Sequence, residues 1–230
     1  PGFDEMLEAV AGVDTSSFSV ASKTAKFAEF PLEEYVARYA RACRLMEEQD
    51  LDAVLVTQDL NVRYFSGYLS ILWASRFRPY VTVLPRDPSL GPTLIVPAQE
   101  TGNATHTSWV ADLLIYPDQE NPVPHIAEAL ADKGLTRGRI GTELGFGQRI
   151  GMTVNQLEAL KTTIAPVELV DATPLTQAVR MLKSPAEVEC VRRACEISQA
   201  GLEAGYSALK PGMSEKELAR VIGSYASPLT

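Results

Sequence analysis

The chain has 230 residues, of which 46% are hydrophobic and 22% charged, and its formal net charge is −8. The composition is typical of a globular protein, and the length predicts one domain and part of a second. The acidic balance argues against nucleic-acid binding, which needs a basic face, and no run reaches the ~18 apolar residues of a membrane span. Three cysteines, an odd number, indicate a reducing compartment, so we expect a cytoplasmic protein.

The first thirty residues predict an extension, and a clear helix follows them. Within residues 1–30 only residues 4–10 have a helical pattern. Pro31 suits the first turn of a helix, and apolar side chains then recur every three or four residues, which is typical of a helix packed on one face. This apolar stripe consists of Leu32, Tyr35, Val36, Tyr39, Cys43 and Met46.

Residues 53–56 read AVLV, an apolar run that predicts a strand buried on both faces. We expect the mixed aromatic and polar stretch 59–80 to be a loop at the carboxyl end of the sheet, where open α/β sheets usually bind ligands. The arginines of this stretch, which lie beside Trp73 and Phe77, are candidates for ligand binding. Aromatic residues are commonly buried, and three of them are expected in the core: Tyr64, Phe65 and Tyr68.

The middle of the chain predicts alternating strands and helices. A turn-rich segment, PRDPSLGP, joins two strands like a hairpin and therefore predicts antiparallel pairing within the sheet. About six strands with interleaved helices indicate an α/β fold with a mixed sheet. After residue 56 the expected strands are 80–84, 93–96, 113–116, 140–143 and 167–170, and the expected helices are 100–106, 121–134 and one that begins at Thr153.

The segment GFGQRIG at 145–151 allows a second interpretation, because it follows a strand and precedes a helix as the dinucleotide fingerprint G-x-G-x-x-G does. Its third glycine comes one residue late, and the fingerprint belongs in the first βαβ unit. The next helix also has its own capping box, Thr153 with Gln156 at position N3. Nucleotide binding is therefore the weaker interpretation.

Beyond Asp171 the pattern becomes helical. One helix begins at Thr173, a second is capped by Ser184 and Glu187 and runs to about Leu209, and a third follows Ser214. We place the domain boundary near Thr173. The chain then has three parts: an extension over 1–30, an α/β domain over 31–173 and the helical beginning of a second domain over 174–230.

Six segments, in their order and spacing, resemble the N-terminal domain of the creatinase, prolidase and aminopeptidase P family. They are NVRYFSGY at 61–68, RFRPY at 76–80, SWV at 108–110, GRIGTE at 138–143, LVDATPL at 169–175 and RMLKSPAEVE at 180–189. The resemblance implies a ribonuclease H-like α/β domain with a mixed sheet, followed by the first helices of a truncated pita-bread catalytic domain.

The resemblance also implies a metal-dependent parent enzyme. Peptidases of this family hold two divalent metals (Mn, Zn or Co) with carboxylates and a histidine of the pita-bread sheet, and those positions have no match in this chain. Its two histidines, His106 and His125, are expected at the surface, because a metal site needs three or four converging ligands. We therefore expect no catalytic residue and no metal in this chain, and no activity of the chain alone.

The role that the resemblance implies for this chain is substrate recognition. In creatinase-like dimers an arginine of the RFRPY segment reaches the partner's active site and binds the substrate carboxylate. Arg78 matches that position, whereas Arg76 departs from an aromatic contact of creatinase. A guanidinium can form a bidentate pair with a carboxylate, and Trp73 and Phe77 are expected to shield it from water. The alternative for Arg78 is an internal salt bridge that holds the loop.

Two functions remain open. The first is the substrate-recognition and dimerisation portion of a metal-dependent hydrolase, an Xaa-Pro peptidase or a creatinase-like C–N hydrolase, whose partners are a second copy and a small carboxylate-bearing substrate. The second is a non-catalytic protein-interaction module, since some relatives keep the fold, lose the metals and bind proteins. Metal ligands downstream of this chain would favour the first.

Overall fold

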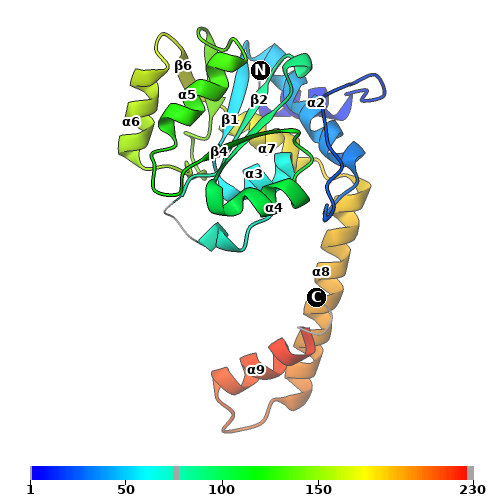
Figure 1. Ribbon diagram of the computed structural model, residues 1–230. Helices are drawn as coiled ribbons and strands as arrows, with labels where there is room; N and C mark the ends of the chain where they lie inside the picture. The colour runs from blue at the N-terminus through cyan, green and yellow to red at the C-terminus, as the bar shows by residue number, and fades with distance from the viewer. Residues whose placement is uncertain (1, 75–77, 227–230) are drawn as a thin grey trace. The chain divides into compact units, whose positions relative to one another are not determined.

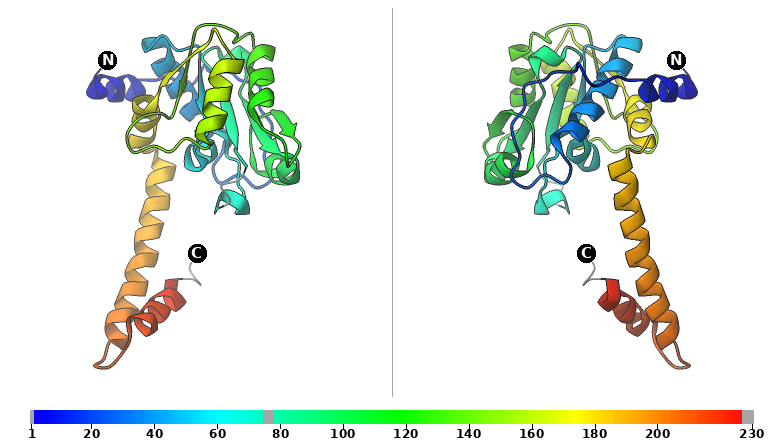
Figure 2. Two further views of the ribbon diagram at one scale, coloured as in Figure 1. Left: turned by 90° about the vertical axis from the view of Figure 1, so that its left-hand side faces the viewer. Right: turned by 90° about the vertical axis from the view of Figure 1, so that its right-hand side faces the viewer.

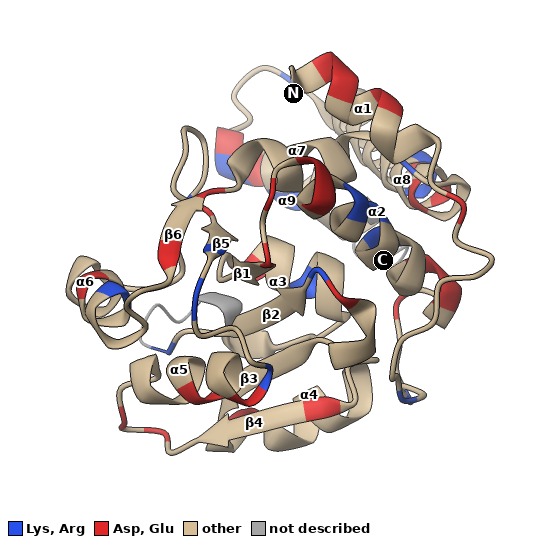
Figure 3. Cartoon of the chain, turned by 90° about the horizontal axis from the view of Figure 1, so that it is seen from above, with Lys and Arg blue, Asp and Glu red and all other residues tan. Residues whose placement is uncertain are grey.

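The computed structural model describes residues 2–74 and 78–226 of the chain (Figure 1). It has two compact units, which divide between Leu182 and Lys183. In the described residues no helix is long and apolar enough to cross a membrane. Acidic and basic residues are interspersed along the elements seen in Figure 3.

The first unit is built around a six-stranded sheet with the order β4-β3-β2-β1-β5-β6 (Figure 3). β2 pairs antiparallel with both β1 and β3, and the other neighbours are parallel. The predicted mixed α/β sheet is therefore confirmed. The strands are β1 (Ala53–Val56), β2 (Val81–Pro85), β3 (Thr93–Pro97), β4 (Asp112–Tyr116), β5 (Arg139–Thr142) and β6 (Glu168–Asp171).

Helices cover both faces of this sheet (Figure 2). Successive side chains of a strand point to opposite faces. In β1, Val54 and Val56 accordingly join one apolar core, and Ala53 and Leu55 join the other. The first core is covered by α1 (Phe3–Ala11), α2 (Leu32–Glu48), α3 (Asp59–Ser66), α4 (Thr101–Thr107) and α7 (Thr173–Met181), and the second by α5 (Val123–Asp132) and α6 (Val154–Thr163).

The N-terminal segment packs onto the first unit. Met6 and Val10 of α1 are buried, and α1 lies against α2 and α7. Further along, Ser22 forms a β-bridge with Val110, and the Lys23 N–H donates to the Trp109 carbonyl oxygen at 2.9 Å. Residues before Pro31 thus contribute to the core of the same unit.

The prediction of a loop over residues 59–80 is wrong for residues 59–66, which form the helix α3. Val62 and Phe65 face the core three residues apart, which is helical spacing that the mixed composition concealed. Gly67 ends the helix with a positive φ of 70°, and an added Cβ there would lie 3.0 Å from the Tyr35 ring. The expected burial of Phe65 and Tyr68 is confirmed, and Tyr64 is partly buried.

The second unit is a pair of helices, α8 (Pro185–Ala208) and α9 (Glu215–Ala226). The predicted capping box of Ser184 and Glu187 is present at the start of α8. The helices approach closely at Gly205, where an added Cβ would lie 2.7 Å from Ile222. The units divide one helix later than our boundary at Thr173, since α7 buries its apolar side chains against α1 and α2 of the first unit.

Candidate functional site

One edge of the sheet gathers the candidate residues. The pairing directions place the carboxyl ends of β1, β3, β4, β5 and β6 at the same edge, where β2 begins. Segments far apart in the sequence therefore meet there, which is where α/β sheets commonly bind ligands. Arg78 lies just before β2, and Gln99 and Asp118 follow β3 and β4.

Arg78 is half-buried at this edge, and its guanidinium is tied to both neighbouring loops. Its Nε donates to the backbone oxygen of Asp118 at 3.2 Å. With the Gln99 amide oriented so that its oxygen faces the guanidinium, this oxygen accepts from Arg78 Nη1 at 2.8 Å and from Nε at 3.2 Å. Arg78 has internal contacts, as the alternative interpretation requires, but these acceptors are neutral oxygens rather than a carboxylate.

Buried contacts anchor the backbone on both sides of Arg78. Pro79 accepts through its carbonyl oxygen a 2.9 Å hydrogen bond from the Tyr116 hydroxyl. On the other side, the hydroxyl of fully buried Tyr68 donates to the Glu100 carboxylate. The next residue, Leu69, donates its N–H to Thr107 Oγ1 at 2.9 Å. The segment that carries Arg78 is thus fastened to the sheet edge at its two ends.

The other three predicted binding residues are not placed by the structure. Arg76 and Phe77 lie outside the described residues, and so does the side chain of Trp73. The backbone of Trp73 belongs to the short 3₁₀ helix η1 (Ile71–Ala74). Their role in shielding a substrate stays a prediction.

A buried carboxylate at the same edge was missed by the sequence analysis. Glu143 is 2% exposed, and its Oε2 accepts from the Thr57 N–H at 2.8 Å, the Thr57 hydroxyl at 2.7 Å and the Gln58 N–H at 2.8 Å. Its Oε1 accepts from Asn61 Nδ2 at 2.7 Å. Burial raises the pKa of the Glu143 carboxyl, and the hydrogen bonds oppose that shift. The position of a glutamate directly after a buried strand was the available signal.

This network joins four segments of the first unit. The Asn61 side-chain oxygen accepts from Arg180 Nη1 of α7 at 2.8 Å, and Thr57 Oγ1 accepts from the Gly151 N–H at 2.9 Å. A Cβ at Gly151 would lie 2.0 Å from the Thr57 carbonyl oxygen. This glycine of the GFGQRIG segment therefore has a packing role against Thr57.

The two histidines occupy different surroundings. His106 is exposed beside Phe27, with ring centroids 6.3 Å apart. His125 is partly buried, stacks on Tyr116 and has Glu120 and Glu128 near its opposite ring nitrogens, at 3.5 and 3.6 Å. Across residues 2–74 and 78–226, no three His, Cys, Asp or Glu residues gather as a metal site would require. The described residues therefore do not fit the implied metal pair.

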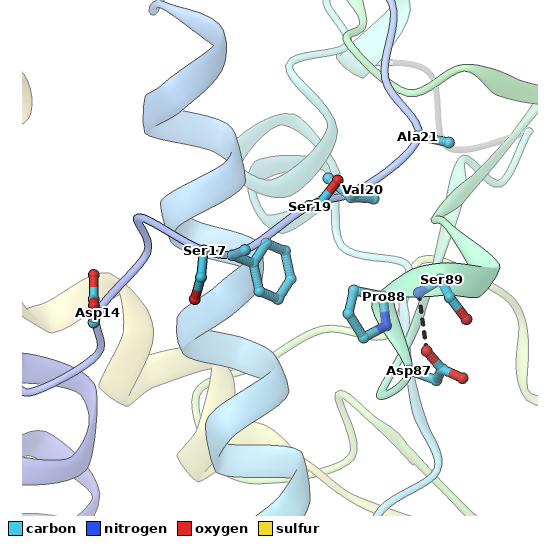
Figure 4. Close-up of a pocket in the computed structure, with 9 residues that line it drawn as sticks. Asp14, Ser17, Ser19, Val20, Ala21, Asp87, Pro88 and Ser89 are labelled. Atoms are coloured by element: carbon cyan, nitrogen blue, oxygen red, sulfur yellow. Dashed lines mark hydrogen bonds between the residues drawn. The ribbon is translucent and has the colours of Figure 1, made fainter.

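An open hollow of about 590 Å³ lies at the opposite edge of the sheet, between the N-terminal segment and the turn from β2 to β3 (Figure 4). Its charged lining residues are Asp14 and Asp87. The Asp87 carboxylate caps its own turn by accepting from the Ser89 N–H at 2.9 Å. Two carboxylates would repel an anionic ligand, so this hollow does not suit a carboxylate-bearing substrate.

Comparison with known proteins gives a consistent picture. The family profile of the Creatinase/Prolidase N-terminal domain matches residues 38–182. A creatinase of Bacillus sp. is 26% identical over 196 residues, which is 83% of this chain and 44% of the relative. An uncharacterized hydrolase/peptidase of Sinorhizobium fredii is 24% identical over 198 residues, 82% of this chain and 48% of the relative. The chain therefore spans about half the length of these relatives.

Solved structures share the fold. An Xaa-Pro dipeptidase from Bacillus anthracis superposes with a TM-score of 0.69 at 17% identity, covering 84% of this chain and 49% of that chain. A proline dipeptidase from Streptococcus pneumoniae has a TM-score of 0.51 at 26% identity and covers 63% of this chain and 98% of that chain.

Proposed function

The chain belongs to the creatinase/prolidase N-terminal domain family, and from this we propose that it is the substrate-recognition and dimerisation portion of a metal-dependent hydrolase. The hydrolase would cleave a C–N bond in a small carboxylate-bearing substrate, either an Xaa-Pro dipeptide or a creatinase-like substrate. Peptidases and a creatinase among the relatives support the hydrolase class. The two metals, Mn, Zn or Co, would be held by a catalytic portion and would supply the activated water.

The observation that carries the proposal is the state of Arg78. This guanidinium lies at the edge where the carboxyl ends of five strands gather, is half-buried and has neutral acceptors at Nε and Nη1. A guanidinium has five N–H donors, and no hydrogen bond from Nη2 is found among the described residues. A charged arginine with donors to spare is suited to bind a carboxylate.

Dimerisation is proposed from the resemblance to creatinase-like dimers, in which an arginine of this segment reaches the partner's active site. The described residues offer Arg78 for binding and no group of metal ligands for hydrolysis. A substrate that touches Arg78 must therefore be bound jointly with a catalytic site that these residues do not form. In the proposed homodimer, Arg78 of one protomer contributes to the catalytic site of its partner.

Kinetics of the full-length hydrolase would test this role, with glycyl-proline as the substrate for a prolidase-type enzyme. We expect Arg78→Ala to lower kcat/KM by an amount equivalent to roughly 2–5 kcal/mol of lost transition-state stabilisation. This is the range for removing one partner of a desolvated charge pair. Arg78→Lys should recover only part of this loss, because an ammonium cannot reproduce the bidentate geometry. Arg137→Ala is the matched control, because Arg137 is exposed and lies just before β5, at the edge of the sheet opposite to Arg78. Unchanged kinetics together with a much lower melting temperature would make Arg78 a structural residue.

The second candidate function, a non-catalytic protein-interaction module, is favoured by the apolar face of α8. Val191, Leu202 and Tyr206 are 54%, 49% and 75% exposed, and an exposed apolar face is typical of a protein contact. The sequence downstream distinguishes the two candidates. Carboxylate and histidine metal ligands there favour the hydrolase, and their loss favours the interaction module.

A further inference from the structure

Gln99 is the side chain that meets Arg78, although 21 positions separate the two residues. It lies in the 3₁₀ helix η3 (Ala98–Glu100), directly after β3. Because β2 and β3 are antiparallel, the end of β3 adjoins the start of β2, and this topology brings Gln99 beside Arg78. The Gln99 backbone is itself fixed, since its N–H donates to Asp118 Oδ1 at 3.1 Å.

The partners found for Arg78 are uncharged, whereas three other arginines of the first unit pair with carboxylates. Arg63 pairs with Glu29, Arg86 with Asp52 at 3.0 Å and Arg139 with Glu168 at 3.8 Å. The acceptors found for Arg78 are instead an amide oxygen and a backbone oxygen. The nearby carboxylate of Asp118 is directed to the Gln99 N–H. An uncharged acceptor orients a guanidinium and leaves its positive charge uncompensated. A carboxylate would orient the guanidinium and also neutralise its charge.

We propose that Gln99 is a positioning residue for carboxylate recognition, an inference that rests on the proposed function of Arg78. Its amide oxygen holds the edge formed by Nε and Nη1 and thereby presents the remaining Nη donors to the substrate. Its neutrality keeps the full positive charge of Arg78 available for an anionic ligand. The ligand class selected in this way is a small molecule with a free carboxylate.

The first test uses this chain itself and measures solvent exchange of the Arg78 Nε–H by NMR, with the signal assigned by its loss in Arg78→Lys. Gln99→Ala should accelerate the exchange by about two- to tenfold, because the Nε–H then loses one of its two neutral acceptors and keeps only the Asp118 backbone oxygen. Gln99→Glu keeps an acceptor oxygen and should leave the exchange slow. Gln119→Ala, an exposed glutamine beside Asp118, is the matched control. Exchange unaffected by Gln99→Ala would overturn the contact.

The second test uses the full-length hydrolase and glycyl-proline. Gln99→Glu should raise KM by about tenfold or more, because a charged partner competes with the substrate for Arg78, while the melting temperature is unchanged or higher. Gln99→Ala should raise KM by about two- to tenfold. If Gln99 merely held the loop in place, Gln99→Glu would not raise KM, because an ion pair with Arg78 would hold the loop at least as well. That result would overturn the inference.

Different results would contradict the proposed role of Arg78 and the proposed role of Gln99. If Arg78→Ala leaves the kinetics unchanged, the proposed function fails, and the inference about Gln99 fails with it. If Arg78→Ala weakens turnover but Gln99→Glu does not change KM, Arg78 keeps its role and only the inference about Gln99 is wrong. In the double variant Arg78→Ala/Gln99→Glu, the second change should add no further loss, because Gln99 acts through Arg78.

Discussion

Replacement of Glu143 should destabilise the first unit more than the loss of an ordinary surface glutamate. This carboxylate is 2% exposed and accepts hydrogen bonds from two backbone N–H groups, a hydroxyl and the amide of Asn61. In Glu143→Ala the N–H and hydroxyl groups of Thr57 and the N–H of Gln58 lose the acceptor Oε2, and Asn61 Nδ2 keeps only the side-chain oxygens of Gln58 at 3.2 Å and Gln148 at 3.4 Å. Each buried group left without a partner costs about 1–3 kcal/mol. Relief of the buried charge offsets part of that cost, so we expect a net loss of about 3–5 kcal/mol.

Glu143→Gln separates the contribution of individual hydrogen bonds. Three of the four bonds converge on Oε2, and the amide oxygen of glutamine can replace that acceptor. The fourth would bring the new NH₂ group against Asn61 Nδ2, a donor against a donor. Asn61 cannot rotate its amide to adapt, because its oxygen already accepts from Arg180 at 2.8 Å. One lost bond predicts a destabilisation of about 1–3 kcal/mol.

Equilibrium urea unfolding, followed by tryptophan fluorescence, measures both losses, since Trp109 is buried in the first unit at 1% exposure. Glu168→Ala is the matched control, because that side chain is 68% exposed and lies 3.8 Å from its partner Arg139. Exposed pairs contribute about 0–1 kcal/mol. A loss below about 1 kcal/mol for Glu143→Ala, or equal losses for Ala and Gln, would refute this account of the network.

Four further predictions concern the isolated chain. With added Mn or Zn it should not hydrolyse glycyl-proline, because its described residues do not gather metal ligands; turnover that a chelator abolishes would contradict this. Hydrogen exchange should be faster in α8 and α9 than in β1, because α8 exposes apolar side chains that β1 buries, and equal protection in a monomer would argue against it. Burial raises the pKa of the Cys43 thiol to about 12 from an ordinary value of 9.0, so a thiol reagent at pH 8 should modify only the exposed Cys190 and Cys195 in the folded chain. Because the unfolded thiol ionises first, this group should lower the free energy of unfolding as the pH rises from about 9 to 12, which urea titrations with and without Cys43→Ala would measure.

Local patterns in the sequence predicted most elements of the fold. The apolar run at 53–56 became β1, and the capping boxes at Thr153 and Ser184 mark the starts of α6 and α8. Such signals are reliable because a helix cap or a strand period depends on residues a few positions apart. The helix α3 was missed where aromatic and polar side chains obscured the helical spacing of Val62 and Phe65.

The family could likewise be identified from short segments read in order, as the family profile over residues 38–182 confirms, and Arg78 could be named as a candidate. The partners of the candidate site could not. Arg78 and Asp118 are 40 positions apart, and Thr57 and Glu143 are 86 apart. They meet because β1 lies between β2 and β5 and because β3 and β4 end at one edge. The strand order, which depends on the packing of the whole unit, therefore decided which polar side chains share that edge, whereas local periodicity determined only where each strand begins and ends.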